Sequence, residues 1–161
     1  MGKAISILMG SSSDLETVKE AIDLLKVFKA GFEVRILSAH RTPKELVEYV
    51  EAASKRGAKV FIAAAGMSAA LAGVIAAHTT LPVIGIPIET KNLKGIDSLL
   101  STVQMPPGIP VGCMAIGRVG AKNAAIFALE ILGTSDKKIQ ARLAKYKKEM
   151  RLKIKKTRIK I

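Results

Sequence analysis

The chain alternates between short apolar stretches and longer stretches in which apolar residues recur every three or four positions. The first pattern predicts β-strands and the second predicts amphipathic helices. Strands are expected over residues 4–9, 32–37, 59–65, 82–88 and 109–116. Helices are expected over residues 15–25, 43–55, 69–77, 96–104, 121–132 and 136–150, the last extending further.

This alternation also predicts how the elements pack. Such a chain forms a parallel sheet with helices on both faces. Five strands favour a flavodoxin-like order, so we expect a three-layer α/β/α fold with a doubly wound five-stranded parallel sheet and a C-terminal helix. Residues 1–135 are expected to form a single α/β domain. Residues 136–161 are expected to form a C-terminal helix and basic tail that packs on the domain or on a neighbouring subunit.

Three polar turns follow predicted strands of this sheet. They cover residues 10–14, 38–41 and 66–68. In doubly wound sheets the ligand binds beyond the carboxyl ends of the strands, where the strand order switches. The sequence therefore predicts that these turns converge on one ligand site.

The second turn holds a histidine beside an arginine. Histidine is the commonest general acid and base of enzymes, and Arg41 beside His40 is a cation whose planar fork suits phosphate. Thr42 is expected to cap the next helix and Pro43 to begin it, with Glu45 completing a capping box. By itself the turn is equally compatible with an exposed loop histidine beside a surface arginine.

The first turn carries three consecutive serines followed by Asp14. Ser13 and Glu16 have the spacing of a capping box, which predicts a helix N-terminus here. A helix N-terminus attracts anions through its unpaired N–H groups and its dipole. The turn is therefore a candidate phosphate cradle, and the alternative is that the serines only cap the helix.

The net charge of +13 is concentrated at one end of the chain. Residues 137–161 hold twelve of the 26 Lys and Arg residues and one of the 13 acidic residues, a net charge of +11, which leaves +2 for the rest. This segment contains a single aromatic residue and matches no nucleic-acid-binding module. We expect a solvated helix that binds polyanions weakly, with no specific nucleic-acid partner.

Several cofactor classes are poorly supported. Aromatic residues make up 4% of the chain and Trp is absent, which disfavours a flavin site. The turns offer one acidic residue, too few for a phosphoacceptor domain, and the two histidines and Cys113 lack metal-ligand spacing. Cys113 is expected to be an inert core thiol and His78 a structural residue at a helix end. No stretch is long enough to span a membrane and no leader peptide is found, so a cytoplasmic protein is expected.

Four stretches then resemble a known family. They are residues 9–14 (Met-Gly-Ser-Ser-Ser-Asp), 38–43 (Ser-Ala-His-Arg-Thr-Pro), 81–87 (Leu-Pro-Val-Ile-Gly-Ile-Pro) and 97–111 (Asp-Ser-Leu-Leu-Ser-Thr-Val-Gln-Met-Pro-Pro-Gly-Ile-Pro-Val). Together they resemble the N5-carboxyaminoimidazole ribonucleotide mutases and aminoimidazole ribonucleotide carboxylases of purine biosynthesis, over residues 4–133. The resemblance implies a catalytic domain over residues 1–135, a homo-octamer, a small nucleotide substrate, and neither a metal nor an organic cofactor.

The resemblance also implies roles for individual residues. His40 would be the general acid and base, and Asp14 would bind the ribose hydroxyls. The substrate phosphate would be bound by Ser11, Ser13, Ser38 and Arg41. Four more residues would complete the substrate-binding set: Ala39, Gly66, Met67 and Ser68. Gly66 and the backbone that follows it, at Met67 and Ser68, would line the imidazole and carbon dioxide pocket.

One stretch departs from the family pattern and leaves two activities open. Where a typical bacterial mutase reads Gly-Ala-Gly-Gly-Ala-Ala-His-Leu-Pro-Gly, residues 64–73 place Ala70 at the His and Ala72 at the Pro. Ser68 matches the serine that the carboxylases using free carbon dioxide carry in this stretch. Residues 41–43 and 104–111 instead resemble the corresponding segments of the mutases. The expected function is the mutase and the alternative is the carboxylase. A more distant alternative is a non-catalytic protein that binds a phosphoribosyl ligand or RNA.

Overall fold

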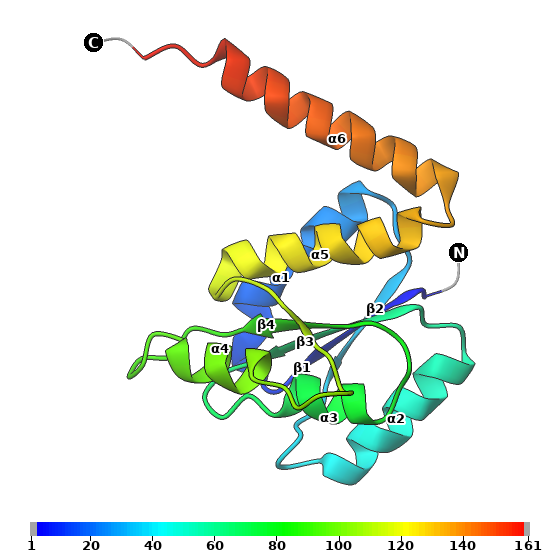
Figure 1. Ribbon diagram of the computed structural model, residues 1–161, viewed down its shortest axis with the longest axis vertical. Helices are drawn as coiled ribbons and strands as arrows, with labels where there is room; N and C mark the ends of the chain where they lie inside the picture. The colour runs from blue at the N-terminus through cyan, green and yellow to red at the C-terminus, as the bar shows by residue number, and fades with distance from the viewer. Residues whose placement is uncertain (1–2, 160–161) are drawn as a thin grey trace.

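The computed structural model describes residues 3–159 and contains one five-stranded parallel sheet (Figure 1). The strands lie in the order β2-β1-β3-β4-β5, as in flavodoxin-like folds. They are β1 (Ile5–Met9), β2 (Phe32–Ile36), β3 (Val60–Ala65), β4 (Val83–Pro87) and β5 (Gly112–Cys113). The fold class expected from the sequence is confirmed.

Helices cover both faces of this sheet. They are α1 (Leu15–Val27), α2 (Pro43–Lys55), α3 (Leu71–Ala77), α4 (Ile96–Val103), α5 (Gly117–Gly133) and α6 (Lys137–Lys156), and a short 3-10 helix, η1 (Ser12–Asp14), precedes α1. Helices α1 and α5 pack on one face, and α2 and α3 pack on the other (Figure 1). No helix within residues 3–159 combines the length and the apolar character needed to cross a membrane.

The central strands are apolar on both faces because both faces are covered. Alternate residues of β1 point to opposite sides, so that Ile7 joins the cluster under α1 and α5 whereas Leu8 joins the cluster under α2 and α3. On β3, Ile62 and Phe61 divide in the same way. These buried side chains form the core and hold the carboxyl ends of the strands in a fixed arrangement.

The last strand is shorter than the eight residues expected. Only Gly112 and Cys113 pair with β4, opposite Ile84 and Gly85. Pro110 cannot donate a ladder hydrogen bond, which opposes pairing earlier in this segment. Cys113 is only partly buried, contrary to the expectation of a core thiol, and its burial raises the thiol pKa.

Helix α5 begins four residues earlier than expected. Residues 117–120, which include two glycines, lie between the strand expected to end at residue 116 and the helix expected to begin at residue 121. Gly120 instead lies inside the helix, where an added Cβ would stand 1.6 Å from the carbonyl oxygen of Ala115. The glycine therefore permits a close approach between the helix and the segment that precedes it, rather than marking a turn.

Helix α6 packs on the domain through its first half. Asp136 caps the helix by accepting from the backbone N–H of Lys138 at 2.8 Å. Leu143 is buried, and the Tyr146 ring meets the Phe28 ring edge-on with centroids 5.5 Å apart. Beyond residue 150 every described residue is exposed, and Figure 1 shows this end projecting away from the sheet.

Candidate active site

A cavity of about 620 Å³ lies at the carboxyl ends of β1, β2, β3 and β4. Its wall is formed by the three polar turns and by the residues that follow β4. All ten candidate site residues line it, namely Ser11, Ser13, Asp14, Ser38, Ala39, His40, Arg41, Gly66, Met67 and Ser68. The parallel topology brings these turns together because they all follow strands at the same edge of the sheet.

The serine turn is tied together by its own side chains. Ser11, not Ser13, is the N-cap, and Asp14, not Glu16, completes the capping box. The Ser11 backbone N–H donates to Asp14 Oδ2 at 3.1 Å, and the Ser13 N–H donates to Ser11 Oγ at 3.3 Å. The expected box fails because a 3-10 turn precedes α1 and moves the cap two residues towards the N-terminus.

Asp14 is the buried acid of the cavity, with 6% of its surface exposed. Burial raises the pKa of its carboxyl above the usual value of 3.8, and the Ser11 N–H, the Ser13 hydroxyl and the Arg41 charge oppose that shift. Its two oxygens already accept from Ser11 and Ser13. Asp14 therefore holds the shape of the serine turn, whatever else it binds.

The side chain of Thr42 closes the second turn and does not cap helix α2. The Thr42 hydroxyl accepts from the Ser38 N–H at 2.8 Å and donates to the Ser38 carbonyl at 3.1 Å. This hydroxyl is thereby used inside the turn and makes no cap hydrogen bond to α2, so the predicted Thr42–Glu45 capping box is wrong. Helix α2 nevertheless spans Pro43 to Lys55, the range predicted from the sequence.

Arg41 links the first two turns. Its Nη2 donates to the carbonyl oxygen of Gly10 at 2.7 Å, and its backbone N–H donates to Ser38 Oγ at 3.2 Å. His40 lies beside it, exposed, with no side-chain hydrogen bond to another residue within the described part of the chain. The cavity therefore presents a guanidinium, serine hydroxyls and an imidazole along one wall, a set suited to a phosphate-bearing ligand that undergoes proton transfer.

The third turn has an unusual backbone. Met67 adopts a left-handed conformation with φ of +58°, and 69% of its surface is exposed. The preceding residue, Gly66, lies close to the segment that follows β4. An added Cβ at Gly66 would stand 3.2 Å from Cγ2 of Thr90. The carbonyl of Ala65 accepts from the Ile88 N–H at 2.9 Å, which ties this turn to the end of β4.

Seven further residues that were not among the ten candidates also line the cavity, namely Gly10, Ala65, Ala70, Leu71, Ile88, Glu89 and Thr90. The last three follow β4, and the rule that ligands bind at carboxyl ends would have found them if applied to the fourth strand as well. Thr90 is held by its hydroxyl, which lies 3.2 Å from both carboxylate oxygens of Asp97. Glu89 adds a second carboxylate to the wall.

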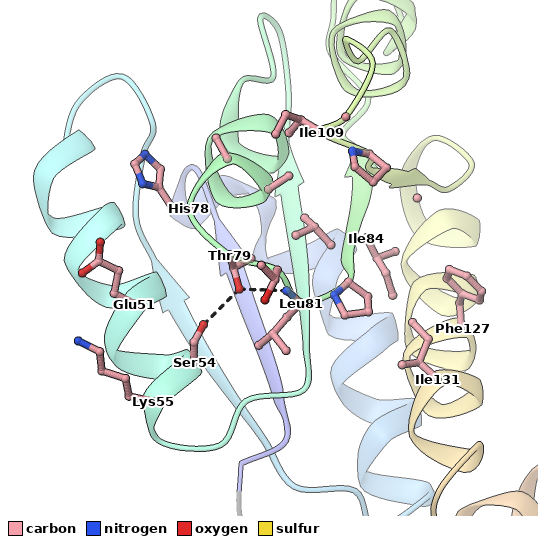
Figure 2. Close-up of a pocket in the computed structure, with 18 residues that line it drawn as sticks. Glu51, Ser54, Lys55, His78, Thr79, Leu81, Ile84, Ile109, Phe127 and Ile131 are labelled. Carbon is pink, nitrogen blue, oxygen red and sulfur yellow. Dashed lines mark hydrogen bonds between the residues drawn. The ribbon is translucent and has the colours of Figure 1, made fainter.

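A larger cavity of about 1230 Å³ lies at the opposite edge of the sheet (Figure 2). Apolar residues such as Leu81, Ile84 and Phe127 supply much of its lining. Figure 2 shows the Ser54 and Thr79 hydroxyls facing each other, 3.3 Å apart. These hydroxyls pair with each other, and the one lysine of the lining, Lys55, shares the wall with the carboxylate of Glu51, so the smaller cavity is the better candidate for an anionic ligand.

Neither cavity has the composition of a metal site. Within residues 3–159 no group of three or more His, Cys, Asp or Glu side chains is arranged to hold a metal ion. His78 lines the larger cavity and His40 the smaller one, at opposite edges of the sheet. The donors gathered around His40 are instead those that bind an anion.

Comparison with known proteins gives consistent matches over nearly the whole chain. The AIR carboxylase family model matches residues 4–153, so the match extends into α6, beyond the motif resemblance that ends at residue 133. The N5-carboxyaminoimidazole ribonucleotide mutase of Saccharolobus solfataricus is 48% identical over 155 residues, covering 96% of this chain and 97% of the relative. The mutase of Bacillus subtilis is 50% identical over 143 residues, covering 89% of this chain and 88% of the relative. The crystal structure of Treponema denticola PurE is 30% identical, with a TM-score of 0.85, and the match covers 93% of this chain and 92% of that one.

Proposed function

The chain belongs to the AIR carboxylase family, and we propose that it is an N5-carboxyaminoimidazole ribonucleotide mutase, an isomerase of purine biosynthesis. The reaction moves the carboxylate of N5-carboxyaminoimidazole ribonucleotide from the exocyclic nitrogen to ring carbon C4. The observation that carries this proposal is the convergence of His40, Arg41 and the serine turn on one cavity, in a chain about half identical to proteins of that name. The alternative of a carboxylase that uses free carbon dioxide is not favoured, because these relatives are named as mutases.

The proposed phosphate site lies between the first two turns. Ser11, Ser13, Ser38 and Arg41 supply hydroxyl, backbone and guanidinium donors there. Arg41 contributes a permanent charge and a fixed fork, and binding at Gly10 and Ser38 preorients it. Asp14 is proposed to accept from the ribose hydroxyls, and the turn at Gly66–Ser68 is proposed to face the imidazole.

The proposed mechanism uses His40 twice. Its imidazolium protonates the exocyclic nitrogen while the carbamate N–C bond breaks, which releases carbon dioxide and a free amine. C4, activated by that amine, attacks the carbon dioxide and forms the new C–C bond. The neutral imidazole then takes the C4 proton and the ring regains its aromaticity, so no proton is gained or lost overall. Retention of carbon dioxide beside C4 supplies a high effective concentration.

We further propose a cytoplasmic homo-oligomer, the octamer that the family resemblance implies, acting without membrane, nucleic acid, metal or organic cofactor. An exposed apolar stripe on α4 supports the oligomer: Ile96, Leu100 and Val103 are each about half exposed and recur at helical spacing on one face. Light scattering of the purified protein would give the subunit count. Activity that survives exhaustive chelation would support the absence of a metal.

The function is tested by two ATP-free assays of the purified protein. One supplies freshly prepared N5-carboxyaminoimidazole ribonucleotide and the other supplies aminoimidazole ribonucleotide with modest bicarbonate, and both follow the C4-carboxylated product. A mutase turns over the carbamate rapidly. Efficient use of free carbon dioxide would identify the carboxylase instead, and inactivity in both assays would favour a non-catalytic binder.

The role of His40 is tested with a matched pair of variants. His40→Asn should lower kcat by about 10²-fold or more, while the dissociation constant for aminoimidazole ribonucleotide changes little, because the variant loses proton transfer and keeps the phosphate site. The control is His78→Asn, at the opposite edge of the sheet, which should retain full activity. Substantial turnover by His40→Asn would remove this residue from the mechanism.

A further inference from the structure

The segment after β4 brings into the candidate site a carboxylate that no other group of the cavity uses. Glu89 lines the cavity and is exposed, and its side chain makes no hydrogen bond or ion pair within residues 3–159. The other acid of the cavity differs, because the carboxylate oxygens of Asp14 accept from Ser11 and Ser13. An unpaired carboxylate repels the anionic groups of a phosphate ester unless the ligand also offers it a donor. Glu89 therefore calls for a hydrogen-bond donor on the ligand.

The backbone on both sides of Glu89 is held in place. The Ile88 N–H donates to the last carbonyl of β3 at 2.9 Å, and the Ile88 carbonyl accepts from the Ser98 hydroxyl at 2.8 Å. On the other side, the Thr90 hydroxyl lies 3.2 Å from both carboxylate oxygens of Asp97. The start of α4 thus fixes the segment that carries Glu89, so that the carboxylate is presented to the cavity from a rigid base.

The strand order places Glu89 at the end of the cavity away from the proposed phosphate site. The turns that line the cavity follow β2, β1, β3 and β4 in that spatial order, with Arg41 on the first, the serine turn on the second and Glu89 on the last. Neighbouring strands lie about 4.8 Å apart, so β4 stands about 10 Å from β1. A nucleotide held by its phosphate at the first two turns therefore extends its base over the third turn towards Glu89.

The proposed substrate offers few donors to such a carboxylate. Its phosphate, its carbamate oxygens and the unsubstituted ring nitrogen accept hydrogen bonds. Its donors are the ribose hydroxyls, which are assigned to Asp14 in the proposed site, and the N–H of the exocyclic nitrogen. This N–H is present in the carbamate, in aminoimidazole ribonucleotide and in the C4-carboxylated product, so a single acceptor can hold the base throughout the reaction.

We propose that Glu89 accepts a hydrogen bond from the exocyclic nitrogen of the base and thereby selects amino-substituted imidazole ribonucleotides. This inference rests on the mutase function proposed above. The exocyclic nitrogen donates its N–H to Glu89 and presents its lone pair to His40, which delivers the proton while the N–C bond breaks. Glu89 forms no covalent bond and neither gains nor loses a proton. It is a specificity-determining residue, because a site built to bind an N–H rejects a ligand that lacks it.

The test compares two ligands that differ only in the amine. Dissociation constants are measured by calorimetry for aminoimidazole ribonucleotide and for imidazole ribonucleotide, its analogue without the exocyclic amine, at a mildly alkaline pH where both rings are neutral. The wild type should bind the ligand with the amine about tenfold more tightly, and Glu89→Ala should lose most of this ratio. The ratio isolates the contact with the amine, because removal of a negative charge changes the affinity for both phosphate esters alike.

Two further variants serve as controls. Glu89→Gln keeps an acceptor oxygen at the same place and should retain most of the ratio. Glu51→Ala removes an exposed carboxylate of α2 at the larger cavity (Figure 2) and should leave the ratio unchanged. An unchanged ratio in Glu89→Ala, or a wild type that binds both ligands equally, would overturn the proposal for Glu89. A wild type that shows the Glu89-dependent ratio but forms no C4-carboxylated product would instead overturn the mutase function and leave the contact with the amine standing.

Discussion

Two largely buried carboxylates of this protein have pKa values shifted in opposite directions. Burial dominates at Asp14, where it raises the pKa despite hydrogen bonds from the serine turn. At Glu33, on strand β2, burial also acts to raise the pKa, but the Tyr49 hydroxyl and the charges of Arg56 and Lys3 outweigh it and lower the pKa below the usual 4.5. The balance between burial and hydrogen-bonded or charged partners therefore decides whether the ionised form of a carboxylate stabilises the fold.

The lowered pKa of Glu33 predicts a pH-dependent contribution to stability. Arg56 Nη2 lies 3.2 Å from one carboxylate oxygen of Glu33, and Lys3 Nζ lies 3.5 Å from the other. Since the folded state binds the proton more weakly than the unfolded state, this stabilisation is present above pH 4.5 and is lost as the pH falls through the lowered pKa. Glu33→Gln should cost about 1 kcal/mol at neutral pH and much less near pH 3, as measured by urea unfolding.

An exposed carboxylate provides the control for this prediction. Glu45→Gln, on the first turn of α2, should change stability little at either pH, because Glu45 is exposed and makes no ion pair within residues 3–159. A cost of Glu33→Gln that stays constant between neutral pH and pH 3 would contradict the electrostatic account. It would indicate a loss of packing instead.

At the scale of elements, the sequence correctly predicted the helices and strands whose buried residues produce a clear hydrophobic pattern. Strands β1, β3 and β4 and helix α2 lie within a residue or so of their predicted ranges, because each has either an uninterrupted apolar run or a clear amphipathic face. The predicted capping boxes at Ser13 and Thr42 were wrong because the observed hydrogen bonds depend on a 3-10 turn that follows Ser11 and on a local hydroxyl bridge between Thr42 and Ser38. The start of α5 was wrong because Gly120 continues the helix and lies against the carbonyl of Ala115, and glycines at this spacing read equally well as a turn.

The candidate site shows the same division. The three turns could be predicted to converge, since the strand order of a doubly wound sheet follows from its alternating elements. The residues after β4 were missed because their polarity is that of an ordinary loop, and the left-handed backbone at Met67 has no signature in a run of small residues. The location of the ligand site can thus be predicted from the sequence, whereas the left-handed backbone that shapes part of the site cannot.

The packing of α4 on β4 predicts a compensating pair of substitutions. Helix α4 lies on the α2 and α3 side of the sheet, and its buried Thr102 faces Gly85 of β4. A Cβ at Gly85 would stand 2.2 Å from Thr102 Cγ2. Gly85→Ala should therefore cost about 1–3 kcal/mol of unfolding free energy through overpacking.

The second substitution removes the methyl group in the way. Thr102→Ser keeps the hydroxyl that donates to the Ser98 carbonyl at 2.7 Å, and by itself it should cost about 0.5–1.5 kcal/mol for the lost methyl. The double variant should be more stable than Gly85→Ala alone, giving a favourable coupling energy in a double-mutant cycle. Simple additivity of the two costs would show that α4 moves away from the sheet to accommodate the new side chain.

At the scale of the whole molecule, the excess positive charge and the candidate active site lie in different parts of the chain. The cavity depends on one arginine in the turn between β2 and α2, whereas the excess positive charge lies at residues 137–161. Figure 1 shows the distal end of α6 projecting from the domain, away from the sheet. Only the first half of α6, through Leu143 and Tyr146, contributes to the core. The strongly basic character of the chain therefore belongs to its C-terminal segment, which does not line the candidate site.

This separation predicts the outcome of removing residues 151–161. The deletion removes six Lys and Arg residues and no acidic residue, and every described residue of the segment is exposed. The melting temperature and the mutase activity should stay close to those of the intact chain, because Leu143 and the contact between Phe28 and Tyr146 remain. Retention on a polyanion column should weaken, with elution at lower salt, because fewer counterions are released on binding.

A full-length variant distinguishes the loss of charge from the loss of chain. Replacing the same six basic residues by Gln should reproduce the weaker polyanion retention while keeping α6 at its full length. Loss of activity in the deletion alone would mean that the exposed apolar side chains Leu152 and Ile154 serve assembly, since charge would then be excluded as the cause. Loss of activity in both variants would place the positive charge itself in the function, through attraction of the anionic substrate over a distance that salt screens.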